Sequence, residues 1–419
     1  MTQHVVVIGA GIVGAASAIE LLRDGHRVTI VEPGEPGGEQ AASYGNGTLL
    51  NPSSVIPMSS PGIWRKVPGW LADPLGPLAI RWRYLPRLLP WLTRFLRAGD
   101  TEAKVAATAR ALRPLLLDAP ARHRRLAEEA AVGELITRQG VLFVFPTRAD
   151  FAAEGHAWRV RRETGVQWLE LSADELRQRE PGLDRRYTFG VLVEENGQCH
   201  DPGAYVAALV RHAEFLGARL VQERAVGFRI ENRRLRAVLT GTGEIAADKA
   251  VIAAGAWSKV LAAAAGDRVP LETERGYHAV ITQPGIAPRY PVMPSDGKMA
   301  CVMTPQGLRL AGQVELAGLD AAPNWRRAEV LRDFARQVFP DLPHGLPEGA
   351  VKVWMGHRPS MPDGLPCIGP ASGCADVVHA FGHGHVGLTA GAATGRLVAD
   401  LVGGRQPEMD IGAYSAGRF

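Results

Sequence analysis

The first thirty residues alternate between buried-type strands, a glycine-rich turn and a helix. A β-branched run at 4–8 leads directly into the turn at 9–14, and apolar residues with helical spacing follow over 15–22. Gly25 stands where this helix should end, and a second β-branched strand is predicted over 27–31. Continuous apolar strands of this kind are typical of a parallel sheet covered on both faces.

The end of the chain repeats this pattern. A strand is predicted over 377–381, a second glycine-rich turn over 382–387 and a helix over 388–402. Between the two ends, short strands alternate with Pro and Gly turns over 271–310, as in an antiparallel sheet, and a helix is predicted over 326–338. The fold class expected is therefore α/β, with a Rossmann-like domain built from both ends of the chain and an inserted α+β domain on an antiparallel sheet.

A chain of 419 residues, 46% apolar and 21% charged, has the length of two or three ordinary globular domains. We assign 1–58, 190–265 and 352–419 to a cofactor domain, and 59–189 and 266–351 to a substrate domain. This composition excludes a disordered chain, a collagen and a small disulfide scaffold.

The first turn has the spacing of a dinucleotide site. Gly9 permits the tight turn, Gly11 lets backbone amides approach a pyrophosphate, and Gly14 lets the helix pack closely on the strand. Glu32 ends the second strand, where its carboxylate can accept hydrogen bonds from ribose hydroxyls and would repel a 2′-phosphate. These residues disfavour NADP and leave the choice between FAD and NAD open.

Charge and cysteine usage exclude several other classes. The net charge is only +4, which does not suggest a dedicated nucleic-acid binder. No Cys-x-x-Cys pair or metal-type cluster is present, so we expect no metal, and a reducing cytoplasm suits four scattered cysteines. No apolar run reaches the roughly 18 residues of a membrane-spanning helix.

The segment 61–98 is unusual, with seven basic residues and four of the nine tryptophans. These tryptophans are Trp64, Trp70, Trp82 and Trp91. One interpretation is peripheral contact with an anionic membrane, with the indoles at the headgroup level. The other is a solvated helical face whose tryptophans pack into the inserted domain.

Taken together, six ordered motifs resemble the D-amino-acid oxidase superfamily of flavoproteins, and most of all its bacterial D-amino-acid dehydrogenases. They are VVVIGAGIVG with Glu32, SYGNG at 43–47, VIAAGAWS at 251–258, RGYH at 275–278, WMGHRP at 354–359 and GHGHVGLT at 382–389. The resemblance implies non-covalently bound FAD. The cofactor-binding residues that it implies are Gly9, Gly11, Gly14, Glu32, Ser43, Asn46, Gly47, Val226, Ala254, Gly255, Gly384, His385, Val386, Gly387, Leu388 and Thr389.

The resemblance also implies a substrate site. Arg358, in a Gly-x-Arg-Pro setting, would hold the substrate carboxylate, which a planar guanidinium does with two parallel hydrogen bonds. Tyr277 and His278 match positions that line the substrate cavity, and His383 lies in the flavin-facing turn. The alternatives are a structural ion-pair arginine, ordinary strand residues and a histidine that satisfies local backbone groups.

The activity implied is oxidation of D-amino acids by hydride transfer from the α carbon to flavin N5. The GHGHVGLT stretch is somewhat more similar to hydroxyproline-catabolic dehydrogenases, which favours D-proline or cis-4-hydroxy-D-proline. The segment 61–98 resembles that of membrane-associated dehydrogenases, so a quinone or another non-oxygen acceptor is expected, at the inner face of the cell membrane.

Three other functions are compatible with parts of this pattern. An oxygen-using oxidase of glycine, sarcosine or other N-methyl amino acids would share the fold. A nucleic-acid-associated flavoprotein would need an added domain or a basic face with stacking aromatics. A non-catalytic FAD scaffold would not need Arg358 in its Gly/Pro-rich setting.

Overall fold

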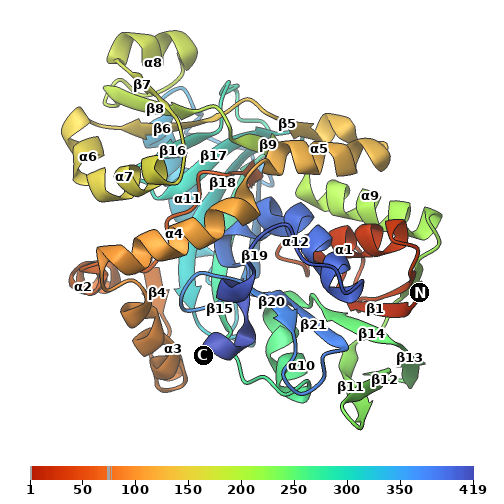
Figure 1. Ribbon diagram of the computed structural model, residues 1–419. Coiled ribbons are helices and arrows are strands. Elements are labelled where there is room, and N and C mark those ends of the chain that lie inside the picture. The colour runs from red at the N-terminus through yellow and green to blue at the C-terminus, as the bar shows by residue number, and fades with distance from the viewer. Residues whose placement is uncertain (1, 73–75, 77) are drawn as a thin grey trace.

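The computed structural model describes residues 2–72, 76 and 78–419. Two large sheets organise this part of the chain (Figure 1). The first is six-stranded, and all its strands are parallel except β20, which runs antiparallel to β21. In order across the sheet they are β10 (Arg219–Val221), β2 (Arg27–Val31), β1 (His4–Ile8), β14 (Lys249–Ile252), β21 (Val377–Phe381) and β20 (Cys367–Pro370).

Both faces of the six-stranded sheet are covered, which explains its continuous apolar strands. Side chains at alternate positions, such as Val5 and Val7, pack under helices on one face, and Val6 and Ile8 pack on the other. The helices are α1 (Ile12–Arg23), α5 (Ala119–Glu129), α9 (Pro202–Phe215) and α12 (Gly387–Val402). The opposite face carries α10 (Ser258–Ala264) and a small antiparallel sheet of β11 (Ala225–Glu231), β12 (Arg234–Thr240) and β13 (Glu244–Ala246).

The second sheet has nine strands and is largely antiparallel. Its path runs through β19 (Val351–Ser360), β15 (Glu272–Ile281), β18 (Gly307–Leu316), β17 (Met299–Thr304), β16 (Val292–Pro294), β6 (Val141–Phe145), β8 (Phe189–Val193) and β7 (Leu169–Leu171), and β4 (Leu78–Ile80) pairs with β18. Helix α11 (Arg326–Val338) packs on it through Leu331 and Ala335.

The remaining elements surround these sheets. A short sheet joins β3 (Leu49–Leu50), β9 (Gly197–Cys199) and β5 (Ile136–Thr137). The remaining helices are α2 (Ile63–Ala72), α3 (Leu85–Ala98), α4 (Glu102–Leu116), α6 (Arg148–Ala153), α7 (Gly155–Glu163) and α8 (Ala173–Arg179). None of the described helices is long and apolar enough to cross a membrane.

The fold class predicted from the sequence is confirmed: a parallel α/β sheet from both ends of the chain accompanies a largely antiparallel sheet from its middle. Two predicted domain boundaries fall inside strands of the second sheet, because residue 190 lies in β8 and residue 352 lies in β19. Both strands belong to the largely antiparallel sheet. The boundaries were misplaced because a short apolar run does not reveal from the sequence which sheet it joins. The division into a cofactor and a substrate domain stays a prediction.

Candidate active site

A cavity of about 1250 Å³ is lined from both sheets. It receives the turns that follow β1, β14 and β21, and it is closed on the other side by residues of β15, β18 and β19. In open α/β sheets, ligands bind at the carboxyl ends of the strands, where these turns lie. The volume exceeds the roughly 300–1000 Å³ of an ordinary small-molecule pocket, so a dinucleotide and a substrate can share it.

The turn after β1 is built so that only glycine fits. Gly9 has a φ of +105°, and a Cβ there would lie 2.5 Å from the carbonyl oxygen of Ala253. A Cβ on Gly14 would overlap the carbonyl oxygen of Gly9. The amide of Ile12, at the start of α1, donates to Ser43 Oγ over 3.1 Å. The positive end of a 12-residue helix and the bare backbone of Gly9 and Gly11 thus face the cavity, as a pyrophosphate requires.

The carboxylate of Glu32 lies beside the glycine-rich turn that follows β1. Glu32 accepts hydrogen bonds from the amides of Ala10 and Gly34, over 2.8 and 3.1 Å, and lines the cavity. Val226, half of whose surface is exposed, lies at the same end of the lining with Arg224. A fixed carboxylate beside an open apolar edge suits the ribose and adenine of a dinucleotide.

The turn after β21 brings a second helix start to the cavity. Residues 384–389 line it, and the 16-residue helix α12 begins at Gly387. All the predicted cofactor residues except Gly14 line the cavity, and Gly14 lies directly behind it against Gly9. Those that line it are Gly9, Gly11, Glu32, Ser43, Asn46, Gly47, Val226, Ala254, Gly255, Gly384, His385, Val386, Gly387, Leu388 and Thr389.

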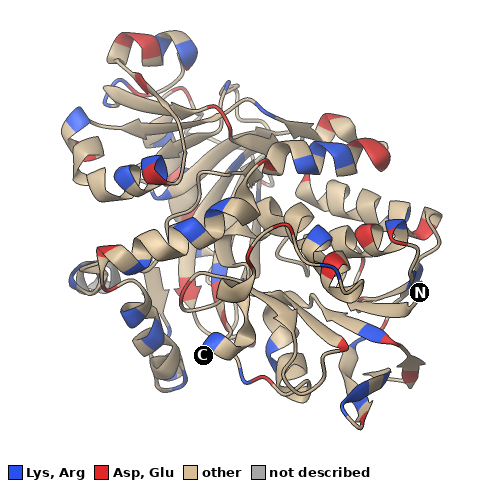
Figure 2. Ribbon diagram, viewed as in Figure 1, with Lys and Arg blue, Asp and Glu red and all other residues tan. Residues whose placement is uncertain are grey.

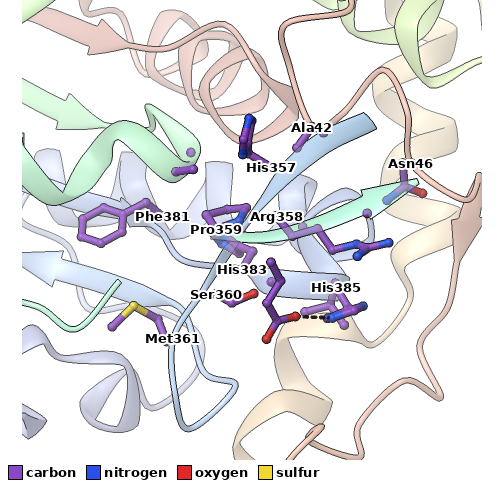
Figure 3. A pocket seen from close by; sticks show the side chains of 18 of the residues that line it. Ala42, Asn46, His357, Arg358, Pro359, Ser360, Met361, Phe381, His383 and His385 are labelled. Atoms are coloured by element: carbon purple, nitrogen blue, oxygen red, sulfur yellow. Dashed lines mark hydrogen bonds and ion pairs between the residues drawn. The ribbon is translucent and has the colours of Figure 1, made fainter. Parts of the chain in front are cut away.

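Arg358 lies at the sheet-lined end of the cavity (Figure 3). Its Nη1 donates to the carbonyl oxygen of Gln313 over 2.9 Å, and its Nη2 donates to that of Gly312 over 3.4 Å. A Cβ at Gly276 would collide with the guanidinium, so this glycine makes room for it. Burial lowers the pKa of Arg358, and nearby Glu274 partly offsets that effect. Within the described residues no carboxylate lies at ion-pair distance from it.

The same end of the cavity contains a carboxylate that the sequence analysis did not select. Glu274 is 5% exposed, lines the cavity and accepts a hydrogen bond from Nε2 of His385 over 2.7 Å. Figure 3 labels His385 and marks its hydrogen bond with a dashed line. Burial alone would raise the pKa of Glu274, but the hydrogen bond from His385 and the charges of His385 and Arg358 outweigh burial and lower it. The carboxylate is therefore ionised at neutral pH.

Comparison with known proteins identifies the family of the chain. The family model described as FAD dependent oxidoreductase matches residues 4–401. The chain belongs to this family. Its resident cofactor is FAD, and the glycine cradle, the two helix starts and Glu32 fit that molecule.

Two curated relatives of this FAD-dependent oxidoreductase span almost its whole length. It is 61% identical over 417 residues to a D-amino-acid oxidase of Bradyrhizobium diazoefficiens, covering 100% of this chain and 99% of that protein. It is 33% identical over 441 residues to D-amino acid dehydrogenase 2 of Ralstonia nicotianae, covering 99% of this chain and 100% of that protein.

Two solved structures share the fold. Glycine oxidase from Geobacillus kaustophilus has a TM-score of 0.76 at 24% identity, with 100% of both chains covered. L-proline dehydrogenase from P. horikoshii has a TM-score of 0.72 at 22% identity, with 100% of this chain and 98% of that chain covered. Both structures support the α/β fold class of the oxidoreductase.

Two predicted substrate residues of the oxidoreductase are not brought to the cavity. Neither Tyr277 nor His278 is among its lining residues. Strand alternation turns Tyr277 away, so that its hydroxyl donates to Glu315 over 2.5 Å in the packed core beneath α11. His278 stacks on Trp354 with 5.1 Å between ring centres and donates to the carbonyl oxygen of Gly45. Burial lowers the pKa of His278 to about 4.

His383 lines the cavity, but its ring forms a hydrogen bond within the protein. Its Nε2 forms a hydrogen bond of 3.0 Å with Thr394 Oγ1 inside α12, and burial lowers its pKa to about 4. His383 is therefore a neutral group that ties the turn to the helix. The only sequence signal for Glu274 is an acid two positions before Gly276. Its burial appears only in the structure, where all ten residues of β15 are buried.

Proposed function

We propose that the protein oxidises D-amino acids at this cavity, using bound FAD. The observation that carries the proposal is Arg358, a guanidinium in the cavity wall whose hydrogen-bond partners are main-chain carbonyls. A substrate carboxylate would supply its missing countercharge through two parallel hydrogen bonds. When bound, FAD accepts the hydride that leaves the α carbon. The chain itself then has to hold the carboxylate, orient the α carbon and exclude water.

The names of the relatives support the D-configuration, because the chain is similar throughout to a D-amino-acid oxidase and to a D-amino acid dehydrogenase. We propose cyclic substrates such as D-proline or cis-4-hydroxy-D-proline as the preferred ones, on the resemblance of the turn at 382–389. We also propose that FAD is held non-covalently, since none of the four buried cysteines lines the cavity.

Anaerobic reduction of the bound flavin tests the activity directly. Purified holoenzyme is mixed with D-proline, cis-4-hydroxy-D-proline, D-alanine, their L-enantiomers, glycine and sarcosine, and the loss of flavin absorbance is followed. We expect bleaching by D-amino acids and fastest bleaching by the cyclic ones. Bleaching by glycine or sarcosine alone would assign the protein to the alternative, an oxidase of glycine, sarcosine or other N-methyl amino acids, and no bleaching would contradict the proposal.

We propose a quinone as the electron acceptor. Part of the cavity lining is apolar and comes from α2, β4 and α3, which suits a lipophilic molecule. This part consists of Ile63, Trp64, Val67, Leu78, Ile80, Trp91, Leu92, Phe95 and Leu96. The name of the 61% identical relative instead favours oxygen as acceptor. Reoxidation of the reduced enzyme by a short-chain quinone and by dissolved oxygen, compared by stopped-flow absorbance, separates the two.

We further propose that the segment 61–98 contacts an anionic membrane at the inner face of the cell membrane. Trp64 and Trp82 are 60% and 68% exposed, whereas Trp91 packs inside, and the side chain of Trp70 lies outside the described part of the structure. Exposed basic residues lie along α3, as the blue segments of this helix in Figure 2 show. Co-sedimentation with anionic but not zwitterionic vesicles, reduced in a W64A/W82A double variant, would support this contact.

A further inference from the structure

Two oppositely charged residues lie side by side on neighbouring strands at the sheet-lined end of the cavity. Glu274 of β15 and Arg358 of β19 are register partners in the antiparallel pair. Such partners have Cα atoms about 4.5–5.5 Å apart, and their side chains point to the same face. Both line the cavity, yet no ion pair joins their side chains among the described residues. Both charged groups can therefore be reached by a ligand in the cavity.

Glu274 is held in place by a residue from the other half of the cavity. His385 belongs to the turn that follows β21, and its Nε2 donates to Glu274 Oε2 over 2.7 Å. The side chain of Glu274 is 7% exposed and that of His385 is 32% exposed. A buried carboxylate costs folding free energy unless it is paired. His385 provides that pairing, and Glu274 still lines the cavity, where a ligand can contact it.

We propose that Glu274 binds the amine of the substrate, that His385 is a positioning residue for Glu274, and that the cavity therefore recognises both charged ends of an α-amino acid. The inference rests on the proposed function and adds the amine subsite to it. Arg358 holds the carboxylate, while Glu274 accepts a hydrogen bond from the amine N–H.

This arrangement also serves the reaction. When the hydride leaves the α carbon for FAD, the nitrogen lone pair forms the C=N bond and the nitrogen becomes positively charged. A fixed carboxylate in a desolvated site stabilises that charge more strongly than it stabilises the neutral amine. His385 and Arg358 keep the pKa of Glu274 below its usual value, which suits a binder of positive charge and not a proton acceptor.

Two isosteric ligands that cannot react provide the test. 2-Aminoisobutyrate and pivalate differ only by an amino group in place of a methyl group, and neither has an α hydrogen. Binding to the FAD-loaded enzyme is measured by calorimetry and by the change in flavin absorbance. We expect the wild type to prefer 2-aminoisobutyrate, and E274Q to lose about 10- to 100-fold in affinity for it while its affinity for pivalate is unchanged or higher.

The matched control is D267N. Asp267 is a buried carboxylate that also pairs with a histidine, His379, over 2.7 Å, but it does not line the cavity. We expect D267N to discriminate between the two ligands as the wild type does. FAD content and far-UV circular dichroism show that each variant is folded and loaded.

The role of His385 is tested on the same ratio of affinities. H385A should reduce the preference for 2-aminoisobutyrate several-fold, and H385Q, which retains an N–H donor, should restore most of it. Equal discrimination by wild type and E274Q, or equal binding of both ligands by wild type, would overturn the amine subsite. An intact subsite in a protein that no amino acid bleaches would instead contradict only the proposed oxidation.

Discussion

The two halves of the cavity differ in whether backbone or side chains form their walls. The cofactor half is made largely of backbone: Gly9 and Gly14 admit no side chain, and the starts of α1 and α12 present amides. The substrate half is made of side chains that project from β15 and β19, among them Glu274 and Arg358. Binding FAD requires one fixed backbone shape, whereas a substrate is selected by a few charged side chains. A change in the cofactor half should therefore abolish FAD binding, whereas a change in the substrate half should reduce turnover and leave FAD bound.

The largest effect is expected from G9A. A Cβ at a φ of +105°, 2.5 Å from the carbonyl oxygen of Ala253, must displace the turn, so we expect the variant to be purified without FAD. Flavin absorbance relative to protein absorbance measures this. G217A is the control, because Gly217 has a φ of +104° with nothing within 4 Å of its Cβ. It should lose stability only, and equal loss of FAD from both variants would remove the special role of the turn.

In the substrate half, R358A should keep FAD and lose turnover. Breaking a buried charge pair with the substrate costs about 2–5 kcal/mol, which is roughly 30- to 5,000-fold in kcat/KM. Anaerobic flavin reduction by the best D-amino acid gives this value. Arg113 pairs with Glu195 and neither residue lines the cavity, so R113A should retain both cofactor and turnover. Wild-type reduction rates in R358A would contradict the assignment of the carboxylate site.

Acid should destabilise the fold through buried histidines such as His383, which lines the cavity, and His278, which does not. The pKa values of His383 and His278 are about 4 because burial disfavours the charged ring, against 6.5 in the unfolded chain. Between these values the unfolded state binds more protons, so the free energy of unfolding falls as the pH drops from 6.5 to 4, by at most about 3 kcal/mol per histidine. Urea unfolding of the holoenzyme at several pH values measures this loss.

Substitution of either histidine sharpens that result. H383Q and H278Q should each reduce the slope of the pH dependence between 6.5 and 4, because glutamine does not titrate. Part of the slope should remain, since burial also lowers the pKa values of His123 and His357 to about 4. Ionisation of Asp24 and Asp376, whose pKa values are held low by arginine and lysine partners, affects stability only below about pH 4. An unchanged slope in both variants would show that other groups govern the acid response.

The smallest effect on activity is expected from Y277F. Tyr277 donates to Glu315 and accepts from the amide of Asn324, and it does not line the cavity. Loss of these hydrogen bonds should cost about 1–2 kcal/mol of stability while kcat/KM changes by less than about twofold. Thermal unfolding and steady-state rates measured on one preparation decide this. A tenfold fall in kcat/KM at unchanged stability would return Tyr277 to the substrate site.

The contrast between the halves also explains which features of the fold and of the site could be predicted from the sequence. Glycine spacing reports backbone geometry directly, so the strands at 4–8 and 377–381 and the helices that follow them were predictable. The direction of a side chain on a strand depends on register and on bulges. A register shift lies between Arg275 and Tyr277 in the pairing of β15 with β18. The inward position of Glu274 and its partnership with His385, 111 positions away, therefore required the folded structure.

The sheet order has a consequence for how the protein is made. Val5 of β1 pairs with Lys249 of β14, and the helix start at 387 arrives later still. At about 5–20 residues per second, synthesis of the intervening chain takes on the order of tens of seconds. Throughout that interval one edge of β1, rich in valine and isoleucine, lacks its neighbour and invites unwanted strand pairing. Cofactor capture is thus a late event, because the sheet that carries the glycine turn is complete only after β14 and β21 have been made.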